Sequence, residues 1–316
     1  MGKDQIGIME YAQQVLEQVR KAVVGKDQVL LWALAAILAK GHILLEDIPG
    51  VGKTTMAVAF AKALGLRYNR MQFTPDVLPS DVTGYSVPDG PEGELRYRPG
   101  AVLCNLFLAD ELNRATSRTQ SALLEAMEEG QVTVDGVSHR MPTPFTVIAT
   151  QNPAGAAGTQ LLPDSQLDRF MVRLQLGYPT AKDELTMVQQ RQQGINPLEQ
   201  VEQVLERSTL QRLQEAVERT YVSEKVGAYV VQLVGATRTS EQLLRGGSPR
   251  ATLAVVALAK AVARLRGRDY VVPKDVQEVF VQTVAHRLTP APDGAEQDVR
   301  ALAAGVLETV RPPKLL

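Results

Sequence analysis

The residues best suited to chemistry form a glycine-rich stretch, Leu-Leu-Glu-Asp-Ile-Pro-Gly-Val-Gly-Lys-Thr-Thr at 44–55. Residues 43–45 are apolar and predict a short buried parallel strand, and the spacing from Thr55 onward predicts a helix packed on a sheet. Such a turn aims successive N–H groups and a helix N-terminus at one small volume, which a polyphosphate can fill. Lys53 is then placed to reach the β- and γ-phosphates, and the Thr54 hydroxyl to bind Mg2+.

We expect the whole loop to contact a bound nucleotide, through Asp47, Ile48, Pro49, Gly50, Val51, Gly52, Lys53, Thr54 and Thr55. Asp47 departs from the usual pattern, because it stands where the first glycine of such a loop normally lies. The pattern Gly-x-Gly-Lys-Thr alone could occur by chance. The strand before it and the helix after it favour a functional loop.

A second group of chemically useful residues follows two further apolar segments. Asp110 and Glu111 come after residues 106–109, and Asn152 comes shortly after residues 145–149. Because ligands of parallel sheets bind beyond the carboxyl ends of the strands, we expect these side chains to face the phosphate loop. Asp110 could hold Mg2+, Glu111 could act as general base on the attacking water, and Asn152 could bind that water and the γ-phosphate. The alternatives are a solvated acidic pair and an ordinary Asn-Pro turn.

Two arginines outside these strands could stabilise charge on a phosphoryl group. Arg169 either pairs with a neighbouring carboxylate, such as Asp164 or Asp168, or acts as a finger in the site of another subunit. Arg250 follows a Ser-Pro pair that predicts the start of a helix. An arginine there is poorly matched to the helix dipole, so a bound anion would explain it. The pattern alone leaves both choices open.

Alternating strands and helices must position these residues. Further patterns predict strands at 67–73 and 170–176, a hairpin at 132–141, and helices at 11–20, 26–40 and 119–129. From about residue 183 we find only helical periodicity, at 184–193, 208–219, 223–239, 249–266, 273–286 and 296–310. We therefore predict an α/β fold with a parallel sheet flanked by helices in residues 1–179, and an all-α domain in residues 180–316.

Composition is that of an ordinary globular protein. Of 316 residues, 45% are hydrophobic and 22% charged, and the formal net charge of -1 argues against a broadly basic nucleic-acid surface. A single cysteine, Cys104, excludes an internal disulfide, and we expect it to be buried. No segment has the length and apolarity of a membrane span, and the N-terminus shows no signal-peptide pattern, so we expect a cytoplasmic protein.

The remaining distinctive side chains have structural explanations. Trp32 lies in the predicted apolar helix at 26–40, so we expect it in the core. The three histidines are scattered along the chain and suggest no metal cluster. Arg264, Arg266 and Arg268 close a predicted helix, where positive charge suits the helix dipole, and we expect a solvated helix end there.

Taken together, these residues resemble the AAA+ ATPases, and within them the MoxR family. The segments that carry the resemblance are 44–55, 73–84, 109–115, 120–129, 149–153 and 167–170, in the family's order. They cover most of residues 20–180, and Gln-Ser-Ala-Leu-Leu-Glu-Ala-Met at 120–127 is far more specific than the phosphate loop. The resemblance implies a P-loop AAA+ core followed by a C-terminal all-α lid domain.

The resemblance also implies roles for individual residues. It assigns Lys53 and Thr54 to Walker A, Asp110 and Glu111 to Walker B, Asn152 to sensor one, Arg169 to the arginine finger, Arg250 to sensor two, and Val24 and Gly25 to the neighbourhood of the adenine. Residues 84–98 would hold the helix-two insertion, and the hairpin at 131–140 the insertion before sensor one; both project from a ring. An acidic residue at position 47 is a variant associated with this family.

The implied activity is Mg2+-dependent hydrolysis of ATP by a ring, expected to be a hexamer, that remodels or matures a protein client. Proteins of this type are commonly linked to a von Willebrand factor A domain partner. One alternative is a nucleic-acid-associated AAA+ motor, which the near-neutral charge disfavours. Another is a nucleotide-gated scaffold with little turnover, which the intact set of Asp110, Glu111 and Asn152 disfavours.

Overall fold

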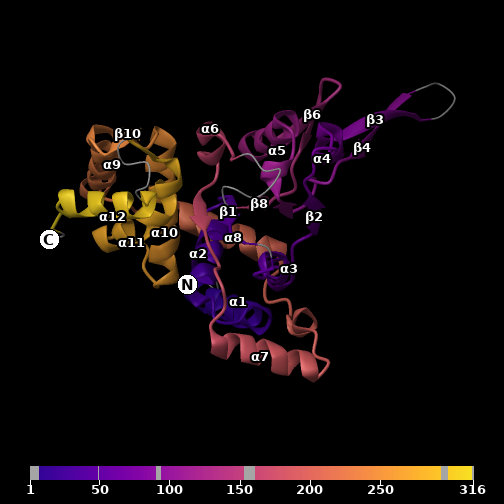
Figure 1. The fold of residues 1–316 in the computed structure, drawn as a ribbon, viewed down its shortest axis with the longest axis horizontal. Coiled ribbons are helices and arrows are strands. Elements are labelled where there is room, and N and C mark those ends of the chain that lie inside the picture. The colour runs from indigo at the N-terminus through magenta and orange to yellow at the C-terminus, as the bar shows by residue number, and fades with distance from the viewer. Residues whose placement is uncertain (1–6, 49, 90–93, 153–160, 293–297, 315–316) are drawn as a thin grey trace, which may run out of the picture.

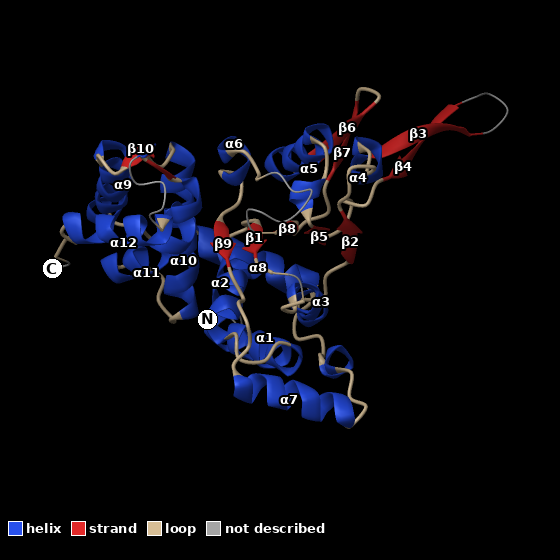
Figure 2. Cartoon of the chain, viewed as in Figure 1, coloured by secondary structure: helices blue, strands red, loops and turns tan. Residues whose placement is uncertain are grey.

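Five parallel strands form the central sheet of this computed structural model, which describes residues 7–48, 50–89, 94–152, 161–292 and 298–314. Their spatial order is β2-β5-β8-β1-β9 (Figures 1 and 2). Their bounds are β1 Ile43–Glu46, β2 Tyr68–Gln72, β5 Leu106–Asp110, β8 Thr146–Gln151 and β9 Val172–Leu174. All neighbouring pairs run parallel, so the carboxyl ends of the strands meet at one edge of the sheet. The predicted parallel sheet is confirmed.

The strand order places the phosphate loop where the chain reverses its direction across the sheet. The chain leaves the carboxyl end of β1 for helix α3 (Lys53–Ala63) and then crosses to β2 at the outer side of the sheet. Later it crosses back from β8, past β1, to β9 at the opposite side. In open parallel sheets the crevice beyond such a reversal is the usual place for a ligand.

The two faces of the sheet pack against different helices. Leu44 and Phe107 belong to a core formed with helix α5 (Ser117–Glu129), which also contains the buried Cys104. Alternate residues such as Ile43 belong to a larger core, formed with α3 and with α1 (Ile8–Ala22) on the other face. Because successive strand residues point to opposite faces, strands covered on both sides are apolar throughout, as the sequence indicated.

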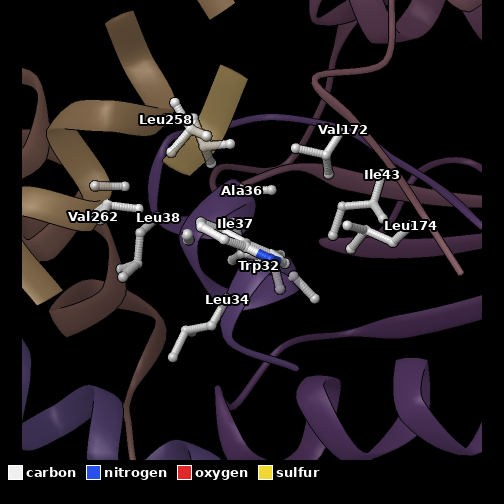
Figure 3. Packing of buried hydrophobic residues seen from close by; sticks show 14 of the residues in the cluster. Trp32, Leu34, Ala36, Ile37, Leu38, Ile43, Val172, Leu174, Leu258 and Val262 are labelled. Carbon is white, nitrogen blue, oxygen red and sulfur yellow. The ribbon is translucent and has the colours of Figure 1, made fainter. Parts of the chain in front are cut away.

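Helix α2 (Asp27–Leu38) fills the space between the sheet and helix α10 (Pro249–Leu265) of the C-terminal half. Figure 3 shows Trp32 of α2 in one apolar cluster with Ile43 of the sheet and Leu258 of α10. Trp32 is 7% exposed, so its predicted place in the core is confirmed. A helix that is apolar on nearly all sides must be buried on all of them, which explains its central position.

Two hairpins extend from the sheet region on the side of α5. Helix α4 (Pro79–Thr83) leads into β3 (Gly84–Asp89) and β4 (Glu94–Pro99), and α5 leads into β6 (Gln131–Val134) and β7 (Val137–Arg140). Figure 2 shows both hairpins pointing away from the body of the molecule. The rings of Tyr97 and His139 stack with centroids 3.6 Å apart, so the two hairpins touch.

The C-terminal half is helical, as predicted, with one exception. Its helices are α7 Ala181–Gln192, α8 Arg207–Glu218, α9 Glu224–Thr239, α10, α11 Pro273–Val284 and α12 Val299–Thr309. The prediction of helices alone is wrong at β10 (Leu243–Arg245) and β11 (Thr289–Pro290), which pair antiparallel. Strands of two or three residues are too short to show alternation in a sequence. The boundary that we place after residue 179 falls between β9 and α7.

The arginines at the end of α10 are not simply solvated, so that prediction is corrected. Asp275 of α11 is fully buried, and both Arg266 and Arg268 form ion pairs with it. Burying a lone carboxylate is costly, and two arginines with their hydrogen bonds offset that cost. None of the helices in the described ranges is both long and apolar enough to cross a membrane.

Candidate functional site

The phosphate loop has the open, left-handed turns that a polyphosphate site requires. Gly50 and Gly52 have φ angles of +87° and +95°, and Gly52 caps the N-terminus of α3. A Cβ atom at either glycine would meet no atom within 4 Å, so the space beside the loop is free for a ligand. Thr54 and Thr55 begin α3 and are partly exposed, whereas Pro49 lies outside the described residues.

Lys53 is buried beneath this loop, and its ammonium group donates to two neutral carbonyl groups. Its Nζ donates to the carbonyl oxygens of Asp47 at 2.6 Å and Ile48 at 3.1 Å, and the residue is 8% exposed. Burial lowers the pKa of Lys53, and the carboxylates of Asp47, Asp110 and Glu111 act against that shift. An ammonium group held by two neutral carbonyl groups in a part-buried site can exchange them for the oxygens of a phosphate.

Asp47 has a role that its place in the loop did not reveal. Its carboxylate accepts the backbone N–H of Ile48 at 3.0 Å and that of Gly177 at 2.7 Å. Asp47 is 7% exposed, and Gly177 lies just after β9, so the carboxylate ties the phosphate loop to the segment that leads to α7. Only its carbonyl group, which accepts from Lys53, belongs to the loop interior.

The turn at Val24 and Gly25 meets the same connecting segment. Lys26 donates to the carbonyl oxygen of Tyr178 at 2.7 Å. A Cβ atom on Gly25, whose φ is +72°, would lie 2.1 Å from Asp183 Oδ2 at the start of α7. The predicted adenine turn and the phosphate loop therefore both contact residues 177–183.

Asp110 ends β5 and Glu111 follows it, at the edge of the sheet where the phosphate loop begins. Asp110 is 8% exposed, and its two oxygens accept from Thr150 Oγ1 at 2.7 Å and from Arg70 Nη2 at 2.6 Å. Glu111 has a left-handed backbone with φ +55°, which costs a residue with a side chain roughly 1–2 kcal/mol. Its N–H donates to Thr150 Oγ1 at 2.8 Å, and this bond helps to hold the strained conformation.

The carboxylate of Glu111 lies between an arginine and Asn152. Arg114 Nη1 is 2.8 Å from Glu111 Oε2, and Asn152 Nδ2 is 3.4 Å from Glu111 Oε1. Asn113 is 2% exposed and holds the backbone of Asn152 through its Oδ1 at 3.3 Å and its Nδ2 at 3.4 Å. The structure thus brings Asn152 and the acidic pair together, as the strand ends predicted.

Arg169 and Arg250 form ion pairs with the same carboxylate. Both form ion pairs with Glu128 of α5, and Arg169 Nη1 also donates to Leu124 O at 2.9 Å. The suggested pairing of Arg169 with Asp164 or Asp168 is wrong, and Glu128 supplies the negative charge that Arg250 required. The Nε atom of Arg169 is buried and lacks a hydrogen-bond partner among the described residues. A pocket of about 360 Å³ lies beside both arginines.

This pair of arginines lies at the edge of the sheet opposite to the phosphate loop. Val172 pairs with Ile43 at the amino ends of β9 and β1, and Arg169 precedes Val172 by three residues. The loop begins beyond the carboxyl end of β1, and the four steps along the chain from Ile43 to Asp47 span roughly 13 Å when extended. The backbone of Arg169 therefore lies near the amino ends of these strands, away from the phosphate loop of its own chain.

Several residues of the site carry no motif that a single sequence reveals. They are Arg70, Asn113, Arg114, Glu128, Thr150 and Gly177. Asn113, Arg114, Glu128 and Thr150 belong to the segments 109–115, 120–129 and 149–153 that carried the family resemblance, so their positions offered a signal. Arg70 and Gly177 are defined only by their tertiary contacts. The described residues include no group of three His, Cys, Asp or Glu side chains suited to a metal ion.

Comparisons with known proteins agree with this arrangement. The family "ATPase family associated with various cellular activities (AAA)" matches residues 42–172, and the family "AAA lid domain" matches residues 235–304. The chain is 40% identical to Chaperone MoxR1 of Mycobacterium tuberculosis, over 94% of this chain and 81% of that protein. It is 32% identical to Protein MoxR of Methylorubrum extorquens, over 94% and 93%. A crystal structure of a Cytophaga hutchinsonii protein superposes with a TM-score of 0.87 at 34% identity, covering 96% of each chain.

Proposed function

Because the chain belongs to the MoxR family of AAA+ ATPases, we propose that it hydrolyses ATP to ADP and phosphate with Mg2+ and uses the reaction to remodel or mature a protein client. The observation that carries the proposal is the position of the Glu111 carboxylate. It is fixed by Arg114 and Asn152 next to Asp110, at the edge of the sheet where the phosphate loop begins. A scaffold that only binds nucleotide would not need this arrangement.

Different residues of one chain would have different roles at the phosphates. Gly50, Gly52 and the first turn of α3 would bind phosphate oxygens through backbone N–H groups, and Lys53 would neutralise their charge. Glu111 would take the proton from the attacking water, which Asn152 would help to orient. Thr54 and Asp110 would hold Mg2+, which prefers oxygen ligands and spreads the phosphate charge when bound.

The positions of Arg169 and Arg250 support a site that two subunits share. Neither arginine can serve the phosphate loop of its own chain from the opposite edge of the sheet, but each could serve that of a neighbour in a ring, for which we propose a hexamer. The Nε of Arg169, which is buried and lacks a partner among the described residues, could donate to a phosphate oxygen once the side chain leaves Glu128. Glu128 would have to release both arginines in the assembled ring.

The client-directed part of the proposal rests on relatives and on shape. The M. tuberculosis relative is named a chaperone. The β3–β4 and β6–β7 hairpins extend from the body of the molecule and are the surfaces that we propose for client contact, with a von Willebrand factor A domain protein as a candidate partner (Figure 2). We propose a cytoplasmic location.

The decisive experiment uses Glu111→Gln as a trap. This variant should bind ATP and Mg2+ with the wild-type affinity, turn over at least roughly a hundredfold more slowly, and retain a client protein in a pull-down with ATP. Glu125→Gln, which changes an exposed glutamate on the nearby helix α5, is the matched control and should behave as wild type. Wild-type turnover in the Glu111→Gln protein would refute the assignment of the base.

The Glu111→Gln variant also distinguishes a protein-remodelling ATPase from a nucleic-acid motor. Retention of nucleic acid instead of protein, with an ATPase that DNA stimulates and salt suppresses, would favour a nucleic-acid motor. The shared site is tested by turnover per subunit, which should rise with protein concentration. Arg169→Ala should abolish this rise in activity, whereas Arg118→Ala, an exposed arginine on α5, should not.

A further inference from the structure

The segment that carries Arg169 is held by the C-terminal helices of its own chain. This segment, residues 164–170, consists of helix α6 (Asp164–Leu167) and the three residues after it, and we call it the finger segment. Figure 1 shows α6 between the C-terminal helical block and α5. Several polar contacts join it to the C-terminal side, one of them from a nearly fully buried side chain.

Arg287 forms the centre of these contacts. It belongs to the short helix η4 (Ala285–Arg287) that continues α11, and its side chain is 4% exposed. Nη2 donates to the carbonyl oxygens of Asp168 at 3.1 Å and Phe170 at 2.7 Å, and Nε lies 3.1 Å from Asp168 Oδ1. One guanidinium group thus binds the backbone on both sides of Arg169.

Three other parts of the C-terminal half hold the same segment. His286 Nε2 lies 2.9 Å from Phe170 O, and Ser248, the N-cap of α10, donates to the Asp168 carboxylate at 2.9 Å. At the start of α6, Asp164 forms an ion pair with Arg245 at 2.5 Å and accepts a hydrogen bond from Thr289 at 3.1 Å. The finger segment is therefore bound from β10, α10, η4 and β11 together.

These contacts form a closed circuit with the two arginines. Ser248 binds Asp168, Arg250 lies two residues after Ser248 and pairs with Glu128, and Glu128 pairs with Arg169, next to Asp168. Within the circuit, the Arg169 side chain is held only at its tip, by Glu128 and the carbonyl group of Leu124. Its backbone is held by the C-terminal helices.

We propose that Arg287 and Asp168 are positioning residues that make the finger segment move with the C-terminal helices, so that the placement of Arg169 in a neighbour's site follows the placement of those helices. The inference rests on the proposed function, because it assumes that Arg169 acts in the site of another subunit. A catalytic group misplaced by about 1 Å can lose roughly a hundredfold in rate. Weakening the contacts of Arg287 with the finger segment should therefore reduce turnover without changing the affinity for the nucleotide.

The first test compares turnover with nucleotide binding. Arg287→Lys keeps the positive charge, but its one nitrogen cannot bind the two carbonyl groups and also replace the contact of Arg287 Nε with Asp168 Oδ1. It should lower kcat roughly ten- to a hundredfold while the Kd for ATP stays within about twofold of wild type. Arg268→Gln is the matched control, since Arg268 also holds a buried carboxylate, Asp275, but does so between the end of α10 and α11. It should lower the melting temperature and leave kcat of the folded protein unchanged.

The second test mixes subunits, which distinguishes positioning from folding. A Glu111→Gln subunit lacks the base but donates an intact finger, whereas an Arg287→Lys subunit has an intact phosphate site and a loosened finger. Turnover of the mixture should exceed the sum of the separate proteins several-fold, as should a mixture of Glu111→Gln with Arg169→Ala.

Each outcome of these tests decides one question. If the Arg169→Ala mixture recovers turnover and the Arg287→Lys mixture does not, the positioning role is overturned while the shared site stands. Wild-type kcat for Arg287→Lys alone overturns the positioning role as well. If neither mixture recovers, the shared site itself fails, and the inference fails with it.

Discussion

Replacing Asp47 by glycine would restore the usual first residue of the phosphate loop, yet we expect the protein to lose stability. The Asp47 carboxylate accepts the N–H groups of Ile48 and Gly177 and is 7% exposed. The first contact is local, but the second joins residues 130 positions apart in sequence. In the Asp47→Gly variant the N–H group of Gly177 loses its partner, and the loop loses its connection to the segment before α7.

The magnitude follows from these two bonds. A hydrogen bond to a charged acceptor contributes about 1.5–3 kcal/mol, and only the long-range bond to Gly177 is counted in full. Glycine adds about 0.5–1 kcal/mol of backbone entropy to the unfolded chain. Together these predict a loss of about 2–4 kcal/mol in the free energy of unfolding, or a melting temperature roughly 3–6 °C lower.

Thermal melting with and without ATP and Mg2+ measures the effect. Asp47→Asn is the matched control, because its amide oxygen can still accept one N–H group, and it should lose about half as much. Hydrogen exchange of the Gly177 amide should accelerate roughly tenfold or more in Asp47→Gly. ATP should still raise the melting temperature of Asp47→Gly, because Gly50, Gly52 and Lys53 remain in place.

An Asp47→Gly protein with wild-type stability and unchanged exchange at Gly177 would refute the reasoning. It would mean that the carboxylate contributes nothing beyond filling the first position of the loop. Loss of ATP binding with unchanged stability would assign Asp47 to the nucleotide instead of the connecting segment.

Three further variants test other parts of the site. Gly52→Ala forces an alanine into the left-handed region, which should cost about 1–2 kcal/mol of stability, and it should also weaken ATP binding in a titration. Gly130→Ala changes a glycine that is also left-handed but lies outside the loop, so it should lower stability without weakening ATP binding. Arg70→Gln removes a cation that competes for Asp110, so half-maximal turnover should need roughly two- to fivefold less Mg2+. Burial, with the positive charge of Arg287 nearby, holds the pKa of His286 well below its ordinary value of 6.5. The unfolded chain therefore binds a proton that the folded chain does not, and stability should fall as pH drops below about 6.5; His286→Gln should flatten this fall in denaturant titrations at pH 7 and pH 5.5.

The parts of the site that were predicted from the sequence share one property, which is that their positions follow from strand ends. Lys53, Asp110 and Asn152 each come soon after an apolar segment, and parallel strands bring their carboxyl ends to one edge. The β10–β11 pair was missed because its strands are too short for alternation. The pairing of Arg169 was misjudged because nearby residues in sequence were considered, whereas its partner, Glu128, is 41 positions away.

The sequence by itself determined the phosphate loop, the acidic strand end, the parallel sheet and the family, because local spacing and backbone chemistry are written into short segments. Only the tertiary structure decided what Asp47 binds, which edge of the sheet carries Arg169 and Arg250, and how Arg287 holds the finger segment. These contacts join residues far apart in the chain, and a side chain that finds its partner only after the sheet, α5 and α10 have packed leaves no period or motif in a single sequence.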